Sequence, residues 1–282
     1  MEFQNVTVIG AGLMGSGIAY VTAVSGRNVT IVDQEQQFVD AGMSKIKDQI
    51  KDGINRGKMS PHEGQQLSQR FKSTVNLEEA VADSDLVIEA VFENMEVKKK
   101  IFSDLSKFTK SECILASNTS TLSITEIASV TEKPDKVVGL HFFSPVAAMK
   151  LVEIIKGDKT ADSTMNQIEA FSDTIGKTSV RCSDSPGFIV NRIVIPLLNE
   201  AVKLLDSGGV TAEDIDKACV LGLNFPVGPL TLADYTGIDI ALAGLQTLER
   251  EFGSCYKPSD TLVKMVEDGK LGMKTKEGFY KY

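Results

Sequence analysis

His141 is one of two histidines in the sequence, and it lies in a largely apolar stretch, GLHFFSPVAAMKLVEII. Histidine titrates near neutral pH, so it can take the proton of a hydroxyl group that is being oxidised. Such a histidine needs a carboxylate on its other ring nitrogen to fix its tautomer, and Glu153 follows twelve residues later. The spacing alone leaves two interpretations open: an acid–base pair, or a core histidine near a solvated glutamate.

The start of the chain carries a glycine-rich pattern, Gly10-Ala-Gly12-Leu-Met-Gly15, between a β-like run and a helical run. In this context the pattern is typical of dinucleotide-binding sites, because the glycines permit a tight turn, close approach of a pyrophosphate and close packing of helix on strand. The N–H groups at the helix start favour the phosphates. Leu13 and Met14 belong to the same predicted loop. The alternative is a tight turn without a ligand.

A carboxylate, Asp33, ends the second β-like run, NVTIVD. It can accept hydrogen bonds from both ribose hydroxyls of a dinucleotide, and it would repel a 2′-phosphate. No Arg or Lys follows within the next several residues. The pattern therefore favours NAD over NADP, with Gln34 beside Asp33 in the predicted site.

Alternating β and α patterns must position these residues in the first half of the chain. The strand candidates are NVTVIG, NVTIVD, DLVIEAV, CILAS, KVVGLHFF and KLVEII, with helical patterns at 12–25 and 95–108. The candidates are short, apolar and partly β-branched, as strands covered on both faces should be. They predict an α/β fold with a Rossmann-type, doubly wound and mostly parallel sheet. Pro145 suits a chain reversal between the last two runs.

A polar, charged segment at about 36–70 interrupts this alternation. Ser60 is a typical helix N-cap and Pro61 a typical first helical residue, so an inserted helix pair is expected. Its basic residues invite a phosphate, although interleaved Asp48 and Asp52 are equally typical of a solvated face. These basic residues are Lys45, Lys47, Lys51, Arg56 and Lys58.

The character of the chain changes after CSDSPGFIV, which predicts an α/β domain over 1–184 and a small all-α domain over 185–282. Helical patterns occupy 187–206, 211–221, 229–251 and 259–268. The first is apolar nearly all round, so part of it is expected to be buried against a second subunit. Asn191 lies in this apolar helix, where an unpaired amide costs roughly 1–3 kcal/mol, and a functional role is therefore plausible.

Composition excludes several classes of protein. Of 282 residues, 42% are hydrophobic and 24% are charged, and the net charge of −8 argues against nucleic-acid binding. The four cysteines have no CxxC spacing and the two histidines are far apart, so no metal site is expected. No apolar run is long enough to span a membrane, and the N-terminal residues show no signal peptide. We therefore expect a cytoplasmic protein with free thiols.

Seven motifs, in order, resemble those of the L-3-hydroxyacyl-CoA dehydrogenase family, especially the short bacterial 3-hydroxybutyryl-CoA dehydrogenases. They are VIGAGLMGSGIA, DLVIEAVFENMEVKKKIF, ILASNTSTLSIT, GLHFFSPVAAMKLVEII, SPGFIVNRI, PVGPLTLADYTGID and KEGFYKY. The resemblance covers essentially the whole chain. It implies NAD-dependent hydride transfer between an L-3-hydroxyacyl-CoA, short-chain, and the 3-oxoacyl-CoA, by a homodimer joined through its helical domain.

The resemblance also implies roles for individual residues. His141 would be the general base in oxidation and the acid in reduction, with Glu153 orienting it. Ser120 would hydrogen-bond the C3 oxygen of the substrate, and Asn191 would contact the substrate. From the residues alone, Ser120 fits better as the N-cap of a helix in TLSITEIA.

Further positions match the family at its cofactor and CoA contacts. Glu93 and Lys98, in FENMEVKK, match cofactor contacts, although an exposed charged helix start is the alternative. Asn118 is expected near the nicotinamide. CoA contacts are expected on the inserted helix, at Lys51 and Arg56, but Asp52 stands where some bacterial relatives have lysine.

The sequence departs from the family pattern near the predicted acyl group. HFFSP replaces the commoner HFFNP, AAMK replaces PVMK, and PVGP replaces PMGP. These changes concern acyl length rather than chemistry. Two other functions remain open: a 3-hydroxyacid dehydrogenase on free acids, which would use a lysine of the helical domain, and an NAD-binding protein without turnover.

Overall fold

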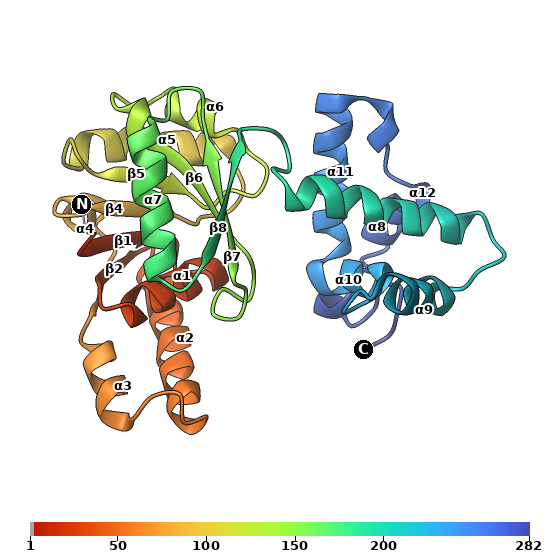
Figure 1. The fold of residues 1–282 in the computed structure, drawn as a ribbon, viewed down its shortest axis with the longest axis horizontal. Helices are drawn as coiled ribbons and strands as arrows, with labels where there is room; N and C mark the ends of the chain where they lie inside the picture. The colour runs from red at the N-terminus through yellow and green to blue at the C-terminus, as the bar shows by residue number, and fades with distance from the viewer. Residues whose placement is uncertain (1–2) are drawn as a thin grey trace. The chain divides into compact units, whose positions relative to one another are not determined.

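The computed structural model describes residues 3–282, and the chain divides into two compact units, Met1–Asp184 and Ser185–Tyr282 (Figure 1). Each unit contains a hydrophobic core of its own. Among the described residues, the helices are all too short or too polar to cross a bilayer.

The first unit is built on one eight-stranded sheet with the order β3-β2-β1-β4-β5-β6-β7-β8. Its strands are β1 (Asn5–Ile9), β2 (Asn28–Val32), β3 (Phe71–Thr74), β4 (Leu86–Glu89), β5 (Ile114–Ser117), β6 (Val137–Phe142), β7 (Leu151–Lys156) and β8 (Thr178–Ser183). All neighbouring strands are parallel except β6 and β7, which pair antiparallel. The predicted Rossmann-type sheet is confirmed.

Central and edge strands differ in burial, and their sequences differ accordingly. Residues of β4, β5 and β6 are buried throughout, which explains their continuous apolar runs. The edge strands β3 and β8 are partly or largely exposed and include Lys72 and Arg181. Neither strand was predicted, because an exposed edge does not require apolar residues.

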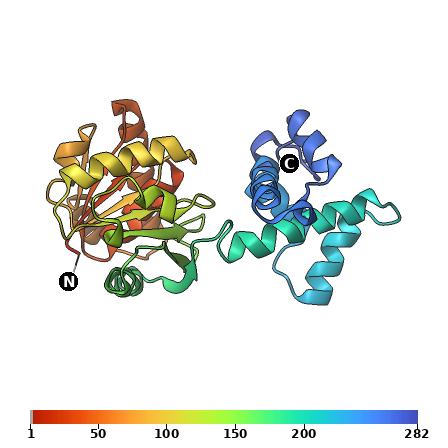
Figure 2. The same cartoon turned by 90° about the horizontal axis from the view of Figure 1, so that it is seen from above.

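Helices cover both faces of the sheet. They are α1 (Leu13–Val24), α2 (Gln36–Asn55), α3 (Pro61–Ser68), α4 (Leu77–Val81), α5 (Met95–Phe108), α6 (Ile124–Ala128) and α7 (Asp162–Thr174), with the 3-10 turn η1 (Pro134–Lys136). Figure 2 shows α5 and α7 on opposite faces. The core beneath α1 and α7 includes Ile18, Ile168 and Phe171.

The predicted helix pair is confirmed as α2 and α3, which project together from this unit (Figure 1). Ser60 caps α3 as predicted: its hydroxyl accepts from Glu63 N at 3.2 Å, and its own N–H donates to Glu63 Oε2 at 2.7 Å. Pro61 is the first helical residue. This reciprocal capping fixes the turn between the two helices.

The second unit is built mainly from helices, with two isolated β-bridges near its last residues. It contains α8 (Val190–Asp206), α9 (Ala212–Leu223), α10 (Pro229–Thr236), α11 (Ile238–Phe252) and α12 (Asp260–Glu267), with the 3-10 turns η2 (Ser254–Tyr256) and η3 (Met273–Thr275). The single helix predicted over 229–251 was wrong, because Gly237 adopts φ +103° and separates α10 from α11. A helix cannot continue through that conformation.

Asp234, in α10, anchors the end of the chain. Its buried carboxylate accepts from the N–H groups of Phe279 and Tyr280, both at 2.9 Å, and from the Tyr282 hydroxyl at 3.1 Å. Burial, together with the Asp234 charge, raises the pKa of Tyr282 to about 12. Two separated motifs, LADYTGID and KEGFYKY, therefore have a shared structural role.

Candidate active site

The glycine-rich turn joins β1 to α1 at the carboxyl edge of the sheet. Gly10 adopts φ +96°, and a Cβ there would lie 2.7 Å from Ala90 O on the neighbouring strand connection. A Cβ on Gly15 would lie 1.7 Å from Gly10 O. Any side chain at either position would collide with backbone, so both glycines are required by the turn itself.

Gly12 differs from these two glycines because its surroundings are open. A Cβ at Gly12 would meet nothing within 4 Å, and the residue is exposed. It directly precedes α1, which begins at Leu13 and has no side-chain cap or acidic residue in its first turn. The first N–H groups of α1 therefore face an accessible, electropositive position suited to a pyrophosphate. Leu13 is exposed there, and Met14 is half-buried.

Asp33 lies just beyond β2 and is fixed by two backbone donors. Its Oδ2 accepts from Ala11 N at 2.7 Å, and its Oδ1 accepts from Gln34 N at 2.7 Å. The first bond ties the carboxylate directly to the glycine-rich turn. Gln34 itself is exposed. The arrangement places an acidic group beside the phosphate-binding turn, as a ribose contact requires.

His141 and Glu153 face each other across the only antiparallel strand pair among the described strands of the sheet. They are register partners in β6 and β7, and His141 Nδ1 lies 2.7 Å from Glu153 Oε2. Both side chains are buried. Because a carboxylate can only accept, Nδ1 donates, and Nε2 is the nitrogen that can exchange a proton with a substrate. The interpretation of a core histidine with a solvated glutamate is therefore wrong for Glu153.

Asn118 joins the ends of three neighbouring strands. Its N–H donates to Glu89 O at 2.8 Å, and its side-chain Oδ1 accepts from Phe142 N at 2.8 Å. The residue is almost fully buried and directly follows β5. Asn118 thus fixes the loop after β5 against the end of the strand that carries His141.

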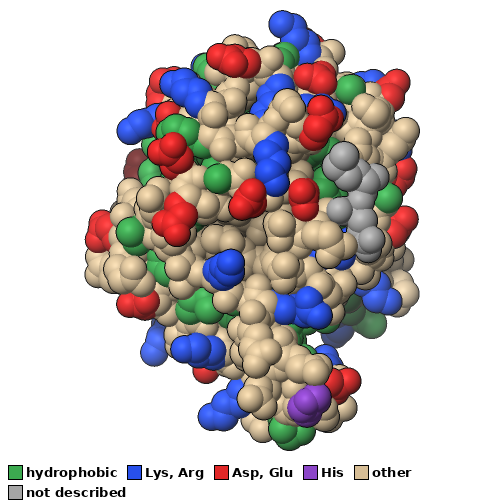
Figure 3. Space-filling view, turned by 90° about the vertical axis from the view of Figure 1, so that its left-hand side faces the viewer, with side chains coloured by type: hydrophobic (Ala, Val, Ile, Leu, Met, Phe, Trp, Pro, Cys, Tyr) green, Lys and Arg blue, Asp and Glu red, His purple; other side chains and the backbone are tan. Residues whose placement is uncertain are grey.

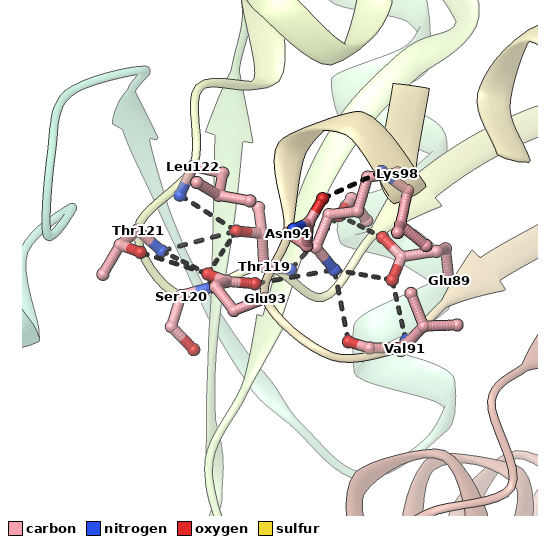
Figure 4. Close-up of polar contacts among 11 residues, drawn as sticks. Glu89, Val91, Glu93, Asn94, Lys98, Thr119, Ser120, Thr121 and Leu122 are labelled. Carbon is pink, nitrogen blue, oxygen red and sulfur yellow. Dashed lines mark hydrogen bonds and ion pairs between the residues drawn. The ribbon is translucent and has the colours of Figure 1, made fainter. Parts of the chain in front are cut away.

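Ser120 lies in a loop whose backbone is held by one carboxylate (Figure 4). Glu93 Oε1 accepts from Ser120 N at 2.8 Å, from Thr121 N at 3.0 Å and from Thr119 Oγ1 at 2.6 Å. The N-cap of α6 is Ser123, whose hydroxyl accepts from Glu126 N. The alternative interpretation of Ser120 as that helix cap was wrong.

Lys98 is completely buried in α5, so the interpretation as an exposed helix start was wrong for this residue. Its ammonium lies 2.6 Å from Glu89 Oε1 and 3.5 Å from Glu93 Oε2 (Figure 4). Burial by itself would raise the pKa of Glu93, but the Lys98 charge and the hydrogen bonds of the loop outweigh it, so that pKa lies below its ordinary value. Cofactor contacts by Glu93 and Lys98 stay predictions.

Two buried charged residues of this region were not predicted from the sequence. Glu89 ends an otherwise apolar, fully buried strand, and a buried acid demands a partner, so the run DLVIEAV did carry a signal. Lys177 is buried before β8, and its ammonium donates to the backbone carbonyls of Val146 and Met149 in the loop between β6 and β7. Burial lowers the pKa of Lys177.

The basic residues of the helix pair lie at the surface. Lys51 and Arg56 are both exposed, and Arg56 Nε pairs with Asp52 Oδ1 at 2.8 Å. Figure 3 shows one face of the molecule with acidic side chains among the basic ones. Asp52 thus partly neutralises Arg56, and contacts to a CoA phosphate stay predictions for Arg56 and Lys51.

Asn191 belongs to the other unit. It is the second residue of α8 and is half-buried. Its predicted contact with the substrate therefore remains a prediction.

Two family models match the chain: 3-hydroxyacyl-CoA dehydrogenase, NAD binding domain, over residues 5–185, and 3-hydroxyacyl-CoA dehydrogenase, C-terminal domain, over residues 187–282. The chain is 44% identical over 280 residues to the 3-hydroxybutyryl-CoA dehydrogenase of Clostridioides difficile, covering 99% of each. It is 41% identical over 288 residues to the mitochondrial hydroxyacyl-coenzyme A dehydrogenase of Homo sapiens, covering 99% of this chain and 91% of that one. The solved structure of (S)-3-hydroxybutyryl-CoA dehydrogenase from Ralstonia eutropha superposes with a TM-score of 0.96 at 39% identity, covering 100% of this chain and 99% of that one.

Proposed function

This chain belongs to the 3-hydroxyacyl-CoA dehydrogenase family, and we propose that it acts on a short-chain substrate such as 3-hydroxybutyryl-CoA with His141 and Glu153 as its acid–base pair. It is an NAD-dependent oxidoreductase that interconverts an L-3-hydroxyacyl-CoA and the 3-oxoacyl-CoA. The observation that carries the proposed pair is the buried 2.7 Å contact between His141 Nδ1 and Glu153 Oε2.

The residues of the β1–α1 turn fit NAD. Gly10 and Gly15 leave no room for side chains, Gly12 opens onto the start of α1, and Asp33 stands beside the turn. Bound NAD supplies the hydride acceptor in oxidation, and NADH supplies the donor in reduction. The Asp33 carboxylate would hydrogen-bond the adenosine ribose and repel a 2′-phosphate.

The chain's own contribution to the reaction is proton transfer and orientation. In oxidation, His141 Nε2 takes the proton of the C3 hydroxyl while the C3 hydride leaves, and in reduction it returns that proton to the C3 oxygen. Glu153 holds the ring by Nδ1 and stabilises the imidazolium that forms. Ser120 would donate a hydrogen bond to the C3 oxygen and so stabilise its partial negative charge.

The proposed substrate is tested with NADH oxidation assays on acetoacetyl-CoA, on longer 3-oxoacyl-CoA thioesters and on free acetoacetate. We expect turnover of acetoacetyl-CoA in preference to both. Because Asp33 repels a 2′-phosphate, NADPH should support the reaction about 10-fold less efficiently, or worse. Turnover of free acetoacetate alone would contradict the proposed function. A preference for long acyl chains would contradict only the proposed chain length.

We also propose that the protein is a cytoplasmic homodimer joined through its helical unit. The dimer is supported by large apolar side chains that this unit exposes: Ile193, Leu204, Leu221, Leu223 and Ile240. Large apolar side chains at the surface are often covered at protein interfaces. The cytoplasmic location is supported by four free cysteines.

Sedimentation equilibrium tests the dimer. We expect twice the mass of the 30.5 kDa chain. Replacing Leu221 with glutamate, at the most exposed of these apolar positions, should weaken association without unfolding the chain. A monomer mass for the parent protein would rule out the dimer.

A further inference from the structure

We propose that the buried ion pair between Lys98 and Glu89 is a positioning device for catalysis: it fixes Glu93, and through Glu93 it fixes the loop that carries Ser120. This inference rests on the proposed function, because it assigns Ser120 to the substrate's C3 oxygen. It adds Glu89 and gives Lys98 a second role beside its predicted cofactor contact; in this role both residues act through others rather than on the reacting atoms.

Glu89 is the fixed end of the device. It ends β4, its side chain is fully buried, and both carboxylate oxygens are engaged (Figure 4). Oε1 accepts from Lys98 Nζ at 2.6 Å and from Val91 N at 2.8 Å, and Oε2 accepts from Ser117 Oγ at 2.6 Å. The carboxylate therefore ties together the end of β4, the end of β5 and the first turns of α5.

Glu93 is the end that holds the loop. One of its oxygens, Oε1, receives three hydrogen bonds of 3.0 Å or less, two of them from the consecutive backbone N–H groups of Ser120 and Thr121. The other oxygen, Oε2, lies 3.5 Å from Lys98 Nζ. The backbone position of Ser120 is thus set by a carboxylate whose other oxygen faces Lys98.

Lys98 links the two ends electrostatically. It is a single cation between two carboxylates, and its side chain has no exposed surface. Between Lys98 and Glu89, which are both fully buried, charges interact much more strongly than at the surface; the side chain of Glu93 is 36% exposed, so its attraction to Lys98 is weaker. Without the ammonium, Glu89 and Glu93 would repel each other, and Glu93 would be drawn toward water and away from the loop. A shift of about 1 Å in a positioning group can cost roughly 10²-fold in rate.

Stability alone does not account for this arrangement. A buried ion pair can often be replaced by uncharged residues with little change in stability, whereas removal of one partner strands the other charge. A variant that removes both charges and keeps the hydrogen bonds of residue 89 separates a role in stability from a role in positioning. Lys98→Met with Glu89→Gln meets this need, because a glutamine at 89 can still accept from Val91 N and still pair with Ser117.

The experiment measures acetoacetyl-CoA reduction by the full-length protein carrying this double substitution. We expect a folded protein whose kcat at saturating NADH is lowered about 10- to 100-fold. NADH affinity is measured separately, because Lys98 is also a predicted cofactor contact. When Ser120→Ala is added, kcat should be no lower than in Ser120→Ala alone, because the pair acts through Ser120. The matched control is Lys99→Met, the neighbouring lysine of α5, which pairs with Glu126 at the surface and should leave kcat unchanged.

Two results would overturn the inference. One is a folded double variant with the parent kcat. The other is a triple variant whose kcat falls by the product of the two separate losses, those of the double variant and of Ser120→Ala. That result would mean that the pair acts elsewhere. If the double variant does not fold, the kcat of Glu89→Gln alone is measured with and without Ser120→Ala, since Lys98 then pairs with Glu93 only. A parent protein that is inactive on acetoacetyl-CoA is a different outcome, which defeats the proposed function itself.

Discussion

Replacement of His141 by glutamine should lower kcat for acetoacetyl-CoA reduction by about 10²- to 10⁴-fold, the usual contribution of a positioned acid–base group. Glutamine retains a polar side chain of similar reach, but it cannot deliver a proton to the C3 oxygen near neutral pH. The KM for acetoacetyl-CoA should change far less than kcat, because the lost interaction belongs to the transition state. Steady-state kinetics with NADH measures both constants.

The protein supplies its own matched control for this substitution. His62, the only other histidine, is exposed on α3. His62→Gln should keep the parent kcat. NADH binding, followed by fluorescence titration, should be unchanged in both variants. Full activity of His141→Gln would show that another group transfers the proton.

Replacement of Glu153 by glutamine should have the second largest effect, a fall in kcat of about 10²-fold or more. The amide carries no charge to stabilise the imidazolium that forms in oxidation, and it can present its NH₂ group to Nδ1 and so select the wrong tautomer. Glu153 is almost completely buried against His141, so no solvent replaces the lost charge. The kcat in both reaction directions and thermal unfolding should be measured together.

Glu169→Gln is the control for this second substitution. Glu169 lies on α7, outside the proposed site, and pairs with Arg181 at the surface. It should alter neither kcat nor, by more than about 1 kcal/mol, the free energy of unfolding. Parent-like kcat in a folded Glu153→Gln variant would reduce Glu153 to a packing role.

The sheet could be predicted largely from sequence because its central strands are buried on both faces, which forces continuous apolar runs. The same physics explains the failures. β3 and β8 lie at the edges, where exposed residues need not be apolar. The break at Gly237 depends on a positive φ that a helical pattern does not reveal.

In the candidate site too, some features could be predicted from the sequence and others could not. The contact of His141 with Glu153 was foreseeable because both residues lie in strands joined by a reversal, although only the observed register makes them direct partners. The burial of Lys98 was not foreseeable from FENMEVKK, because nothing in that charged run distinguishes a fully buried lysine from its exposed neighbours. Its partner Glu89 carried the better signal, as an acid within an apolar strand.

In the loop between β6 and β7, the backbone is held by contacts that do not involve the loop's own side chains. Lys177 donates hydrogen bonds to backbone carbonyls of this loop, so these contacts do not depend on which side chains the loop carries. The strand register sets the partnership of His141 and Glu153 on either side. Substitutions at Ser144, Ala147 and Ala148 therefore leave both constraints untouched. We therefore predict that substitutions at these positions change substrate range without disturbing proton transfer by His141.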